Sequence, residues 1–451
     1  MIAVFDIGRT NKKFLVFDSG GKIAREESVR FPEIPDEDGW PSDDILLLTG
    51  WMKDTLRSAL ADPSLNIQSV NVSAYGASFV HIDKDGRPLT PLYSYLKPFP
   101  ESLKEQFFRD YGPQKIFSAA TASPYLGMLN SGLQIYRLKY EQPDLFSHIR
   151  YSLHLPQYLS FVLGGFATNE ISSTGCHTGL WDFENNELHS WVKKENIAAL
   201  IPPLHPTNQS KTVSFEGHKL EIGTGIHDSS AALVPYLLRI PHPFILLSTG
   251  TWSIAMNPFN REPLTTGELD RDVLAYLTYA GAQVKSSRLF LGNEHDYQLE
   301  RISAHFGVDA SFSRDLKWDE ALFANLAESG GKLIPGTMEG TGPEPLLKNG
   351  NWVMEQFSSP EKAYYRLMWD LTEWQVLSLK LASGSAAPAA VYIDGGFSRN
   401  ELFTRMLARR QPDTQWFVAE IGQATALGAA LVIQPEPARF SFPLTFRRVI
   451  A

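Results

Sequence analysis

The chain of 451 residues, with 43% hydrophobic and 20% charged side chains, is expected to form about two or three domains of an ordinary globular protein. A net charge of −9, with scattered lysines and arginines, excludes the basic surface typical of nucleic-acid binding. The single cysteine, Cys176, excludes an intramolecular disulfide and a thiolate-rich zinc or iron–sulfur site. Because no signal-peptide pattern is found and prolines interrupt the longest apolar stretch, we expect a cytoplasmic protein that makes no membrane contact.

The amino-terminal part predicts a β-meander followed by a helix and a strand. Apolar runs at residues 2–5 and 13–18 and a third strand are separated by a polar turn and a Gly-Gly turn. A helix is predicted over 42–61, with Ser42 and Asp43 as candidate capping residues, and a strand follows over 67–76. This succession is typical of α/β folds.

A second strand–turn–strand unit begins near residue 243. Its order of apolar run, small polar turn and apolar run is similar to that of the first strands, which suggests two related halves. The proline-rich segment 236–244 lies just before it. We therefore predict two domains, residues 1–238 and 239–451.

The last third of the chain predicts alternating helices and strands. The expected helices cover 361–383, 399–410 and 423–433, and the expected strands cover 389–396 and 414–420. This alternation is typical of a parallel α/β unit, in which ligands bind where strands end and helices begin. The last helix, rich in alanine and glycine, would lie beside a nucleotide or pack tightly on the sheet.

A cluster of small and polar residues follows the first strand: Asp6, Gly8, Thr10, Asn11 and Lys12. Glycine lets a backbone approach phosphate closely, hydroxyl and amide groups of a turn cradle phosphate oxygens, and an aspartate there is expected to hold a metal ion through water. Lys12 or Lys13 would offset charge. The alternative is a plain hairpin turn in which local amides satisfy Asp6, and no Walker A motif is present.

The segment 223–235 places Asp228 after two glycines and His227. Asp228 is predicted to start a helix, where aspartate is a common N-cap, so helix capping is one interpretation. The other is a general base that accepts a proton from a hydroxyl nucleophile. The histidines show no spacing typical of a metal site, and the third glycine of a dinucleotide-binding fingerprint is missing.

Two glycine turns in the carboxyl-terminal part are candidates for nucleotide binding. Gly250 and Thr251 form a turn that would grip phosphate, although any hairpin carries such a turn. Gly395 and Gly396 open a strand-to-helix connection, where a flat ring would lie against the glycines while Asn400 hydrogen-bonds to it. A capped loop is the alternative, because asparagine caps helices well.

Five segments in order resemble the motifs of the FGGY carbohydrate kinases: FDIGRTNKKFLVFD, GIHDSSAAL, LLSTGTWSIAM, YIDGGFSRNELF and ALGAAL. The resemblance covers roughly residues 1–435 and is strongest to the rhamnulokinase and fuculokinase branch, through YGASFVHIDKDGRPLTPLYSY and through HDSSAA followed by STGTWS. It implies an α/β fold of two ribonuclease-H-like domains, as in actin and the Hsp70 ATPase, around an interdomain cleft. Ser78, the segment YSYLKP and the segment TGCHTGLWD depart from the sugar-site motifs.

The resemblance also implies a reaction, the ATP-dependent phosphorylation of a primary hydroxyl of a small sugar, a deoxy-ketohexose or ketopentose like L-rhamnulose or L-fuculose. ATP and Mg²⁺ are the implied cofactors, with Asp228 as general base and Asp6 holding the metal. Nucleotide binding is assigned to Gly8, Thr10, Asn11, Lys12, Gly250, Thr251, Gly395, Gly396 and Asn400. Sugar binding is assigned to Gly76, His177, His227 and Asn293. The sugar site, phosphate loop and base would belong to the first domain, and nucleotide binding to the second.

Two other functions are retained. A catalytically silent sensor of sugar or nucleotide on the same fold would account for the altered sugar motifs, although Asp6 and Asp228 argue against it. An actin- or chaperone-like ATPase with a protein partner would lack a base positioned for a sugar hydroxyl. The expected partner is a small sugar, with no nucleic acid and no membrane, and a homodimer is left open. ATP turnover that requires a small sugar separates the kinase from both alternatives.

Overall fold

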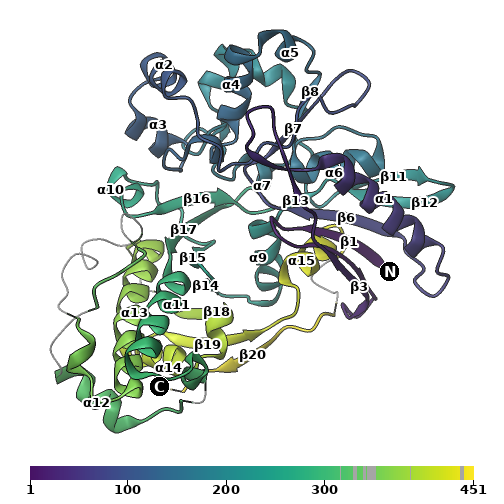
Figure 1. Ribbon diagram of the computed structural model, residues 1–451. Helices are drawn as coiled ribbons and strands as arrows, with labels where there is room; N and C mark the ends of the chain where they lie inside the picture. Colours follow the sequence, from purple (N-terminus) through teal and green to yellow (C-terminus); the bar gives the residue numbers. More distant parts are fainter. Residues whose placement is uncertain are drawn as a thin grey trace. The chain divides into compact units, whose positions relative to one another are not determined.

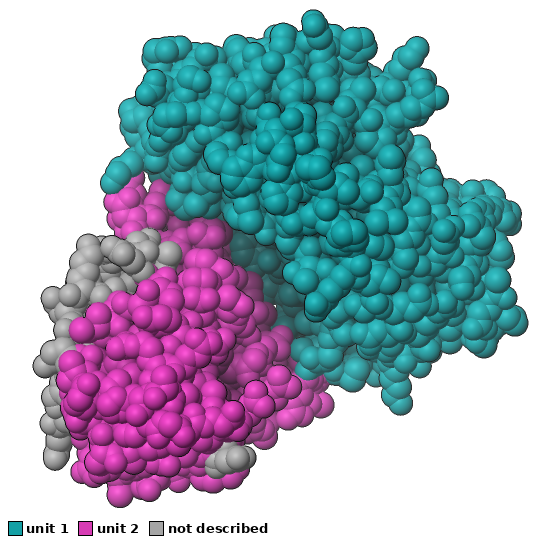
Figure 2. Space-filling model, viewed as in Figure 1, with its two compact units in different colours: residues 1–241, 275–283, 421–443 teal, residues 242–274, 284–420, 444–451 magenta. Residues whose placement is uncertain are grey.

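The computed structural model describes residues 1–314, 316–328, 333–338, 342, 352–385, 388–436 and 441–450. The chain forms two compact units, which are coloured separately in Figure 2. Unit 1 comprises residues 1–241, 275–283 and 421–443, and unit 2 comprises residues 242–274, 284–420 and 444–451. The domain boundary predicted at residue 238/239 lies close to the first change of unit, but two later segments return to unit 1.

Unit 1 is built on a mixed β-sheet with the strand order β11-β12-β6-β1-β2-β3, and β13 also pairs with β6 (Figure 1). The central strand β1 runs antiparallel to β2, with Asp6 opposite Lys13, and parallel to β6, with Asp6 opposite Ser73. The strands that begin in unit 1 are Ile2–Ile7 (β1), Lys12–Phe17 (β2), Ile23–Val29 (β3), Glu33–Pro35 (β4), Pro41–Asp43 (β5), Ser69–Ala74 (β6), Phe79–Ile82 (β7), Tyr151–His154 (β8), Trp181–Asp182 (β9), Glu187–Leu188 (β10), Ser210–Phe215 (β11), His218–Gly223 (β12) and Ile226–His227 (β13), together with β17, given below with unit 2.

Helices of unit 1 cover the sheet and form a second core beside it. That second core is rich in aromatic side chains and is drawn from residues 79–201. The helices are Ile45–Leu60 (α1), Glu101–Tyr111 (α2), Gln114–Ala120 (α3), Gly132–Glu141 (α4), Pro143–Ser147 (α5), Leu155–Gly164 (α6), Ile171–Thr174 (α7), Ser190–Lys194 (α8), Asp228–Arg239 (α9) and Ala424–Val432 (α15), with 3₁₀ turns at Gly127–Leu129 and Ile197–Leu200.

The two faces of the sheet are covered by different helices. α1 and α6 share one buried cluster with alternate residues of β1, β2 and β6. Asn71 of β6 points to the opposite face, where its Nδ2 donates to the carbonyl oxygen of Ala429 in α15 at 2.7 Å. A Cβ on Gly428 would lie 1.8 Å from the carbonyl oxygen of Ala231, so only glycine lets α15 pack this closely on α9. Tight packing, one of the two interpretations of this small-residue helix, is observed in the structure.

Unit 2 contains most of a second sheet, with the order β16-β17-β15-β14-β18-β19-β20. Residues 275–283, at the tip of the β16–β17 hairpin, belong to unit 1. The strands are Ile245–Thr249 (β14), Ser253–Asn257 (β15), Val273–Leu277 (β16), Gln283–Leu289 (β17), Ala390–Gly395 (β18), Gln415–Glu420 (β19) and Thr445–Arg448 (β20). The helices are Thr266–Leu269 (α10), Leu291–Phe306 (α11), Glu320–Glu328 (α12), Pro360–Ser383 (α13) and Glu401–Arg410 (α14), with 3₁₀ turns at Ala310–Arg314, Met354–Gln356 and Gly396–Arg399.

The predicted α/β class is confirmed, and so are the amino-terminal meander and the parallel pairing of β18 and β19. The structure adds β14, which pairs parallel to β18. The predicted cap of α1 is wrong. Its N-cap is Asp44, whose side chain accepts from two backbone amides of the first turn, whereas Ser42 and Asp43 lie in β5. Asp43 instead holds an ion-pair network, described below. No helix in the described parts of the chain is long and apolar enough to span a membrane.

Candidate active site

The phosphate-loop candidates lie in the turn between β1 and β2. The Gly8 amide donates to the carbonyl oxygen of Asn11 at 2.9 Å, and a Cβ on Gly8 would lie only 3.1 Å from that oxygen. Asn11 Oδ1 accepts a hydrogen bond of 2.7 Å from Arg30 Nε. Thr10 is exposed. The turn is therefore tight, and it leaves the Thr10 hydroxyl open to a ligand.

The negative charge of Asp6, near the end of β1, is disfavoured by its surroundings. Burial, followed by the nearby Asp228 carboxylate, raises the pKa of Asp6 to about 7, while Lys13 acts in the opposite direction. The Ser73 side chain also lowers the pKa of Asp6, but its effect is smaller than those of burial, Asp228 and Lys13. Two carboxylates that disfavour each other's charge are a suitable environment for a divalent cation.

The Lys12 side chain is engaged within the protein and is not open to a ligand. It is 3% exposed, with Nζ 3.1 Å from Asp43 Oδ1 and donating to the carbonyl oxygen of Arg9 at 2.8 Å. The Arg9 guanidinium also pairs with Asp43. The structure thus places Lys12 in a buried ion-pair network, and Lys13, opposite Asp6 in the sheet, is the lysine that acts on the Asp6 charge.

Asp228 is the first residue of α9, and its neighbour His227 holds the N-cap position. The Asp228 side chain accepts from the amide of Ser229 at 2.6 Å, so it does not cap the helix in the usual way by accepting from an amide two or three residues further on. The carboxylate is 35% exposed, and its Oδ1 lies 3.1 Å from His227 Nε2. Its immediate surroundings raise the pKa of Asp228 through desolvation, which strengthens it as a base.

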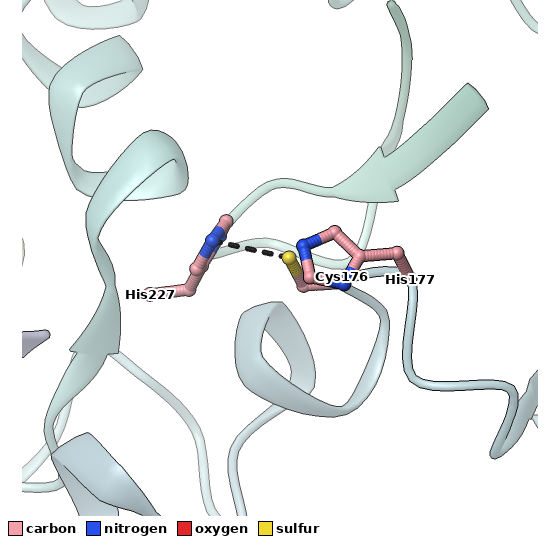
Figure 3. Close-up of side chains that lie close together, drawn as sticks. All are labelled: Cys176, His177 and His227. Atoms are coloured by element: carbon pink, nitrogen blue, oxygen red, sulfur yellow. Dashed lines mark hydrogen bonds between the residues drawn. The ribbon is translucent and has the colours of Figure 1, made fainter. Parts of the chain in front are cut away.

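The predicted sugar ligands His227, His177 and Gly76 lie together (Figure 3 shows the two histidines). A Cβ on Gly76 would lie 3.1 Å from His227 Nε2 and 3.2 Å from Cys176 Sγ, so glycine leaves the space above both groups open. Burial lowers the pKa of His227 to about 4 and keeps its imidazole neutral near pH 7. The structure therefore brings these residues together beside Asp228 in unit 1.

Four of the five nucleotide candidates of unit 2 line one cavity of about 240 Å³, and Gly395 is not among its lining residues. The cavity is lined by Gly250, Thr251, Gly292, His295, Asp296, Gly396, Phe397 and Asn400. A Cβ on Gly250 or Gly396 would have no neighbour nearer than 3.9 Å, so a side chain at either position would fill the cavity instead of clashing with protein. At Gly292 the reason for glycine is different, because a Cβ would lie 2.0 Å from the Gly250 carbonyl oxygen. The cavity thus has glycine walls with room for a flat ligand.

The Asn400 side chain is engaged within the protein. Its Oδ1 caps α14 by accepting from the amide of Phe403 at 3.0 Å, and its Nδ2 donates to the Tyr364 hydroxyl at 2.9 Å. The capped-loop interpretation therefore describes the fold, although Asn400 also lines the cavity. Asn293, predicted to touch sugar, lies in unit 2, where its backbone amide donates to the Thr251 carbonyl oxygen at 3.2 Å.

Two family models match this chain. The N-terminal domain of the FGGY family of carbohydrate kinases matches residues 1–209, and the C-terminal domain of carbohydrate kinase FGGY matches residues 241–440. The chain belongs to the FGGY family of carbohydrate kinases. The predicted actin- and Hsp70-like two-domain fold is confirmed with this family.

Within the FGGY family the chain is similar to rhamnulokinases. A rhamnulokinase of Bacteroides thetaiotaomicron is 26% identical over 95% of this chain and 89% of its own length. For a rhamnulokinase of Halalkalibacterium halodurans the match is 25% identical and spans about half of each protein, 55% of this chain and 54% of the relative. A carbohydrate kinase of Novosphingobium aromaticivorans, 24% identical, has a TM-score of 0.84 over 99% of this chain and 93% of its own, which shows the shared fold.

Two tyrosines near the candidate site of this FGGY chain were not predicted from the sequence. Tyr276 pairs with Cys176 in an isolated antiparallel bridge, and its ring lies 6.0 Å from that of His227. Tyr95, in the segment that departs from the family pattern, is near enough to Asp228 and Arg9 for both charges to act on the pKa of its phenol, which burial raises. Tyr276 lies outside the recognised motifs, and Tyr95 ends a segment that was noted only for its resemblance to the family and its departure from it. The tertiary fold brings both near Asp228.

Proposed function

We propose that this FGGY kinase transfers the γ-phosphoryl group of ATP to a primary hydroxyl of a small ketose, with Asp228 as general base. The observation that carries the proposal is the Asp228 carboxylate, which is partly exposed, has a raised pKa and is not used as a helix cap. A base of this kind takes the hydroxyl proton as the sugar oxygen attacks phosphorus.

The residues of the two units are suited to the two cofactors of such a reaction, the nucleotide and Mg²⁺. The unit 2 cavity, with Gly250 and Gly396 in its wall, suits a nucleotide because a Cβ at either glycine would occupy it. Asp6, whose charge is disfavoured by burial and by Asp228, suits Mg²⁺ held through water. When bound, Mg²⁺ATP supplies the phosphoryl group and neutralises its charge, while Thr10 and Thr251 offer hydroxyls to phosphate oxygens.

A ketose of the L-rhamnulose or L-fuculose type is the sugar we propose. Similarity to rhamnulokinases supports it, and so does the neutral His227 beside Gly76, because a neutral imidazole donates or accepts a hydrogen bond from a hydroxyl. The altered segment around Tyr95 leaves the catalytically silent sensor as the second candidate, in which sugar and nucleotide bind without transfer.

The test is a coupled ADP-release assay of purified protein with Mg²⁺ATP and, one at a time, L-rhamnulose, L-fuculose, L- and D-xylulose, L- and D-ribulose and glycerol. We expect one clear responder. In Asp228→Asn, turnover with that sugar should fall about 10²- to 10⁴-fold with sugar affinity nearly kept. The matched control is Asp144→Asn, a change at an exposed aspartate far along the chain from Asp228, which should leave turnover unchanged.

Two outcomes would contradict this function. Normal turnover in Asp228→Asn would exclude Asp228 as the base. Silence with every sugar, while calorimetry still detects nucleotide and sugar binding, would favour the sensor instead.

A further inference from the structure

Three metal-ligating side chains converge beside Asp228, although the spacing of the histidines in the sequence did not predict a metal site there. Cys176 Sγ, one ring nitrogen of His177 and His227 Nε2 all lie within 4.8 Å of one another (Figure 3). Sγ and Nε2 are 3.1 Å apart. Cys176 and His177 follow α7, whereas His227 ends β13, so the fold joins two segments here. Thiolate and imidazole together are the donors that Zn²⁺ prefers and that Mg²⁺ does not.

The hydrogen bonds of Ser230 determine which ring nitrogen of His227 can bind a metal in this cluster. The Ser230 hydroxyl has one proton, and it donates that proton to the carbonyl oxygen of Leu277 at 2.8 Å. His227 Nδ1, 3.3 Å from the same hydroxyl oxygen, is therefore the donor to Ser230, and Nε2 carries the lone pair. Cys176 Sγ lies 3.1 Å from this nitrogen in hydrogen-bonding geometry, and Asp228 Oδ1 also lies 3.1 Å from it. Electron-rich atoms this close are stabilised by a proton or a cation among them.

His177 is oriented in the way that metal-binding histidines are. Its Nδ1 lies 3.2 Å from the carbonyl oxygen of Leu129, and since a carbonyl only accepts, Nδ1–H is the donor and Nε2 carries the lone pair. Histidines that bind metals characteristically donate their second ring N–H to a carbonyl or carboxylate. The backbone of His177 is also in the left-handed region, with φ +39°, a strained conformation that clusters at functional sites.

We propose that Cys176, His177 and His227 form a binding site for a borderline-soft divalent cation such as Zn²⁺. On binding, the Cys176 thiol loses its proton to solvent, the S–M bond forms, and the two imidazoles bind as neutral ligands. Ligand atoms of a tetrahedral zinc site lie about 3.3–3.6 Å apart. The Cys176–His227 pair already has nearly this spacing, and a shift of about 1 Å by the His177 ring completes the set.

The consequence for catalysis, which rests on the proposed function, is inhibition. A cation bound to His227 Nε2 lies beside Asp228 Oδ1 and occupies the space that Gly76 keeps open for a substrate hydroxyl. Zn²⁺ would then block the enzyme in competition with sugar, while Mg²⁺ acts at Asp6 with oxygen ligands. The sulfur and nitrogen ligands of the cluster select Zn²⁺, whereas the carboxylate oxygens of Asp6 select Mg²⁺, so each cation binds at its own site.

The binding test needs no turnover and uses the full-length protein without nucleotide. Co²⁺ replaces Zn²⁺ as a spectroscopic probe, and since the chain has a single cysteine, a thiolate-to-cobalt charge-transfer band can arise only at Cys176. We expect this band with one equivalent of Co²⁺, its loss on adding Zn²⁺, and release of one proton from the thiol. Zn²⁺ affinity is measured by competition with a chromophoric chelator.

Two variants and a control complete the design. Cys176→Ser and His177→Ala each remove a ligand and should weaken Zn²⁺ binding by more than about 100-fold, beyond the 10- to 100-fold loss typical of outer partners. His148→Ala removes an exposed histidine and should leave the affinity unchanged. Circular dichroism and the melting temperature verify that each variant is folded. Zn²⁺ sensitivity of sugar phosphorylation is compared with each variant's own zinc-free rate in excess Mg²⁺.

The possible outcomes separate the site from the enzyme function. No cobalt–thiolate band in the wild-type protein, or Zn²⁺ affinity that is equal in wild type and Cys176→Ser, overturns the metal site. A band and a Cys176-dependent affinity without any sugar turnover support the site and contradict only the kinase function. Binding that leaves an active enzyme uninhibited supports the site and overturns the block of Asp228.

Discussion

Replacing Gly395 by alanine tests how the unit 2 cavity, which we propose binds nucleotide, is formed. Gly395 ends β18 with φ +84° and ψ −156°, a combination that is essentially restricted to glycine. A Cβ at this position would lie 1.9 Å from the carbonyl oxygen of Thr249, its partner in the parallel pair of β14 and β18, whereas real Cβ contacts are almost never under 3.0 Å. Relief of this contact requires the two strand ends to separate by about 1.1 Å.

The magnitude follows from these two effects. The backbone conformation alone costs about 1–3 kcal/mol with a Cβ present, and the separation of β14 from β18 adds to it, so we expect unit 2 to lose roughly 3 kcal/mol of stability or more. The separated strands carry Gly250 and Gly396, which line the cavity. Since a misplacement of about 1 Å in a binding site can cost roughly 10²-fold, ADP affinity should fall by about 10- to 100-fold.

The assay combines denaturant unfolding with calorimetric titration of ADP. Gly396→Ala is the matched control, because the next residue lacks a positive φ and its Cβ would lie 3.9 Å from the Thr249 carbonyl oxygen. It should keep the wild-type unfolding midpoint and still weaken ADP binding, since its Cβ stands in the cavity. If Gly395→Ala unfolded at the wild-type midpoint, the argument from backbone geometry would be refuted.

Other expected results concern the residues around Asp228. In the metal-binding role that we propose for Asp6, only the ionised carboxylate binds a cation. Because the pKa of Asp6 is raised to about 7, Mg²⁺ affinity measured by calorimetry should then fall as the pH drops through about 7. Asp228→Asn removes a carboxylate that raises this pKa, so the midpoint should move to lower pH, and an unchanged midpoint would show that the two groups are uncoupled. Gly76→Ala places a Cβ 3.1 Å from His227 Nε2 and 3.2 Å from Cys176 Sγ, and it should raise KM for the sugar with ADP affinity unaltered; equal KM values would place the sugar elsewhere.

Local sequence signals predicted the secondary structure at the two ends of the chain, the strands around residue 250 and the positions of the glycine turns. The alternation of apolar residues and the Gly-Gly and Gly-Thr turns are local, so the strands β1, β2, β14 and β18 follow from short windows of sequence. The cap of α1 was misplaced by one or two residues, from Asp44 to Ser42 or Asp43, because several adjacent residues are all good caps.

What could not be predicted depends on contacts between distant segments. Lys12 and Lys13 are equivalent in sequence, but alternation along β2 directs Lys12 to Asp43 and Lys13 toward Asp6. Tyr276 reaches the region of the base only because the tip of the β16–β17 hairpin packs in unit 1. These placements follow from tertiary contacts, which short sequence motifs do not predict.

The return of α15 to unit 1 has a consequence for how this protein is made. Residues 424–432 pack on α9 and on one face of the sheet that begins at Ile2, so the first unit cannot close its core before these late residues have left the ribosome. The chain passes between the units at five points, and no single cut separates them. A fragment ending at residue 241 would expose the apolar face that α15 covers, and during synthesis the nascent chain must keep that face from aggregating until the helix arrives.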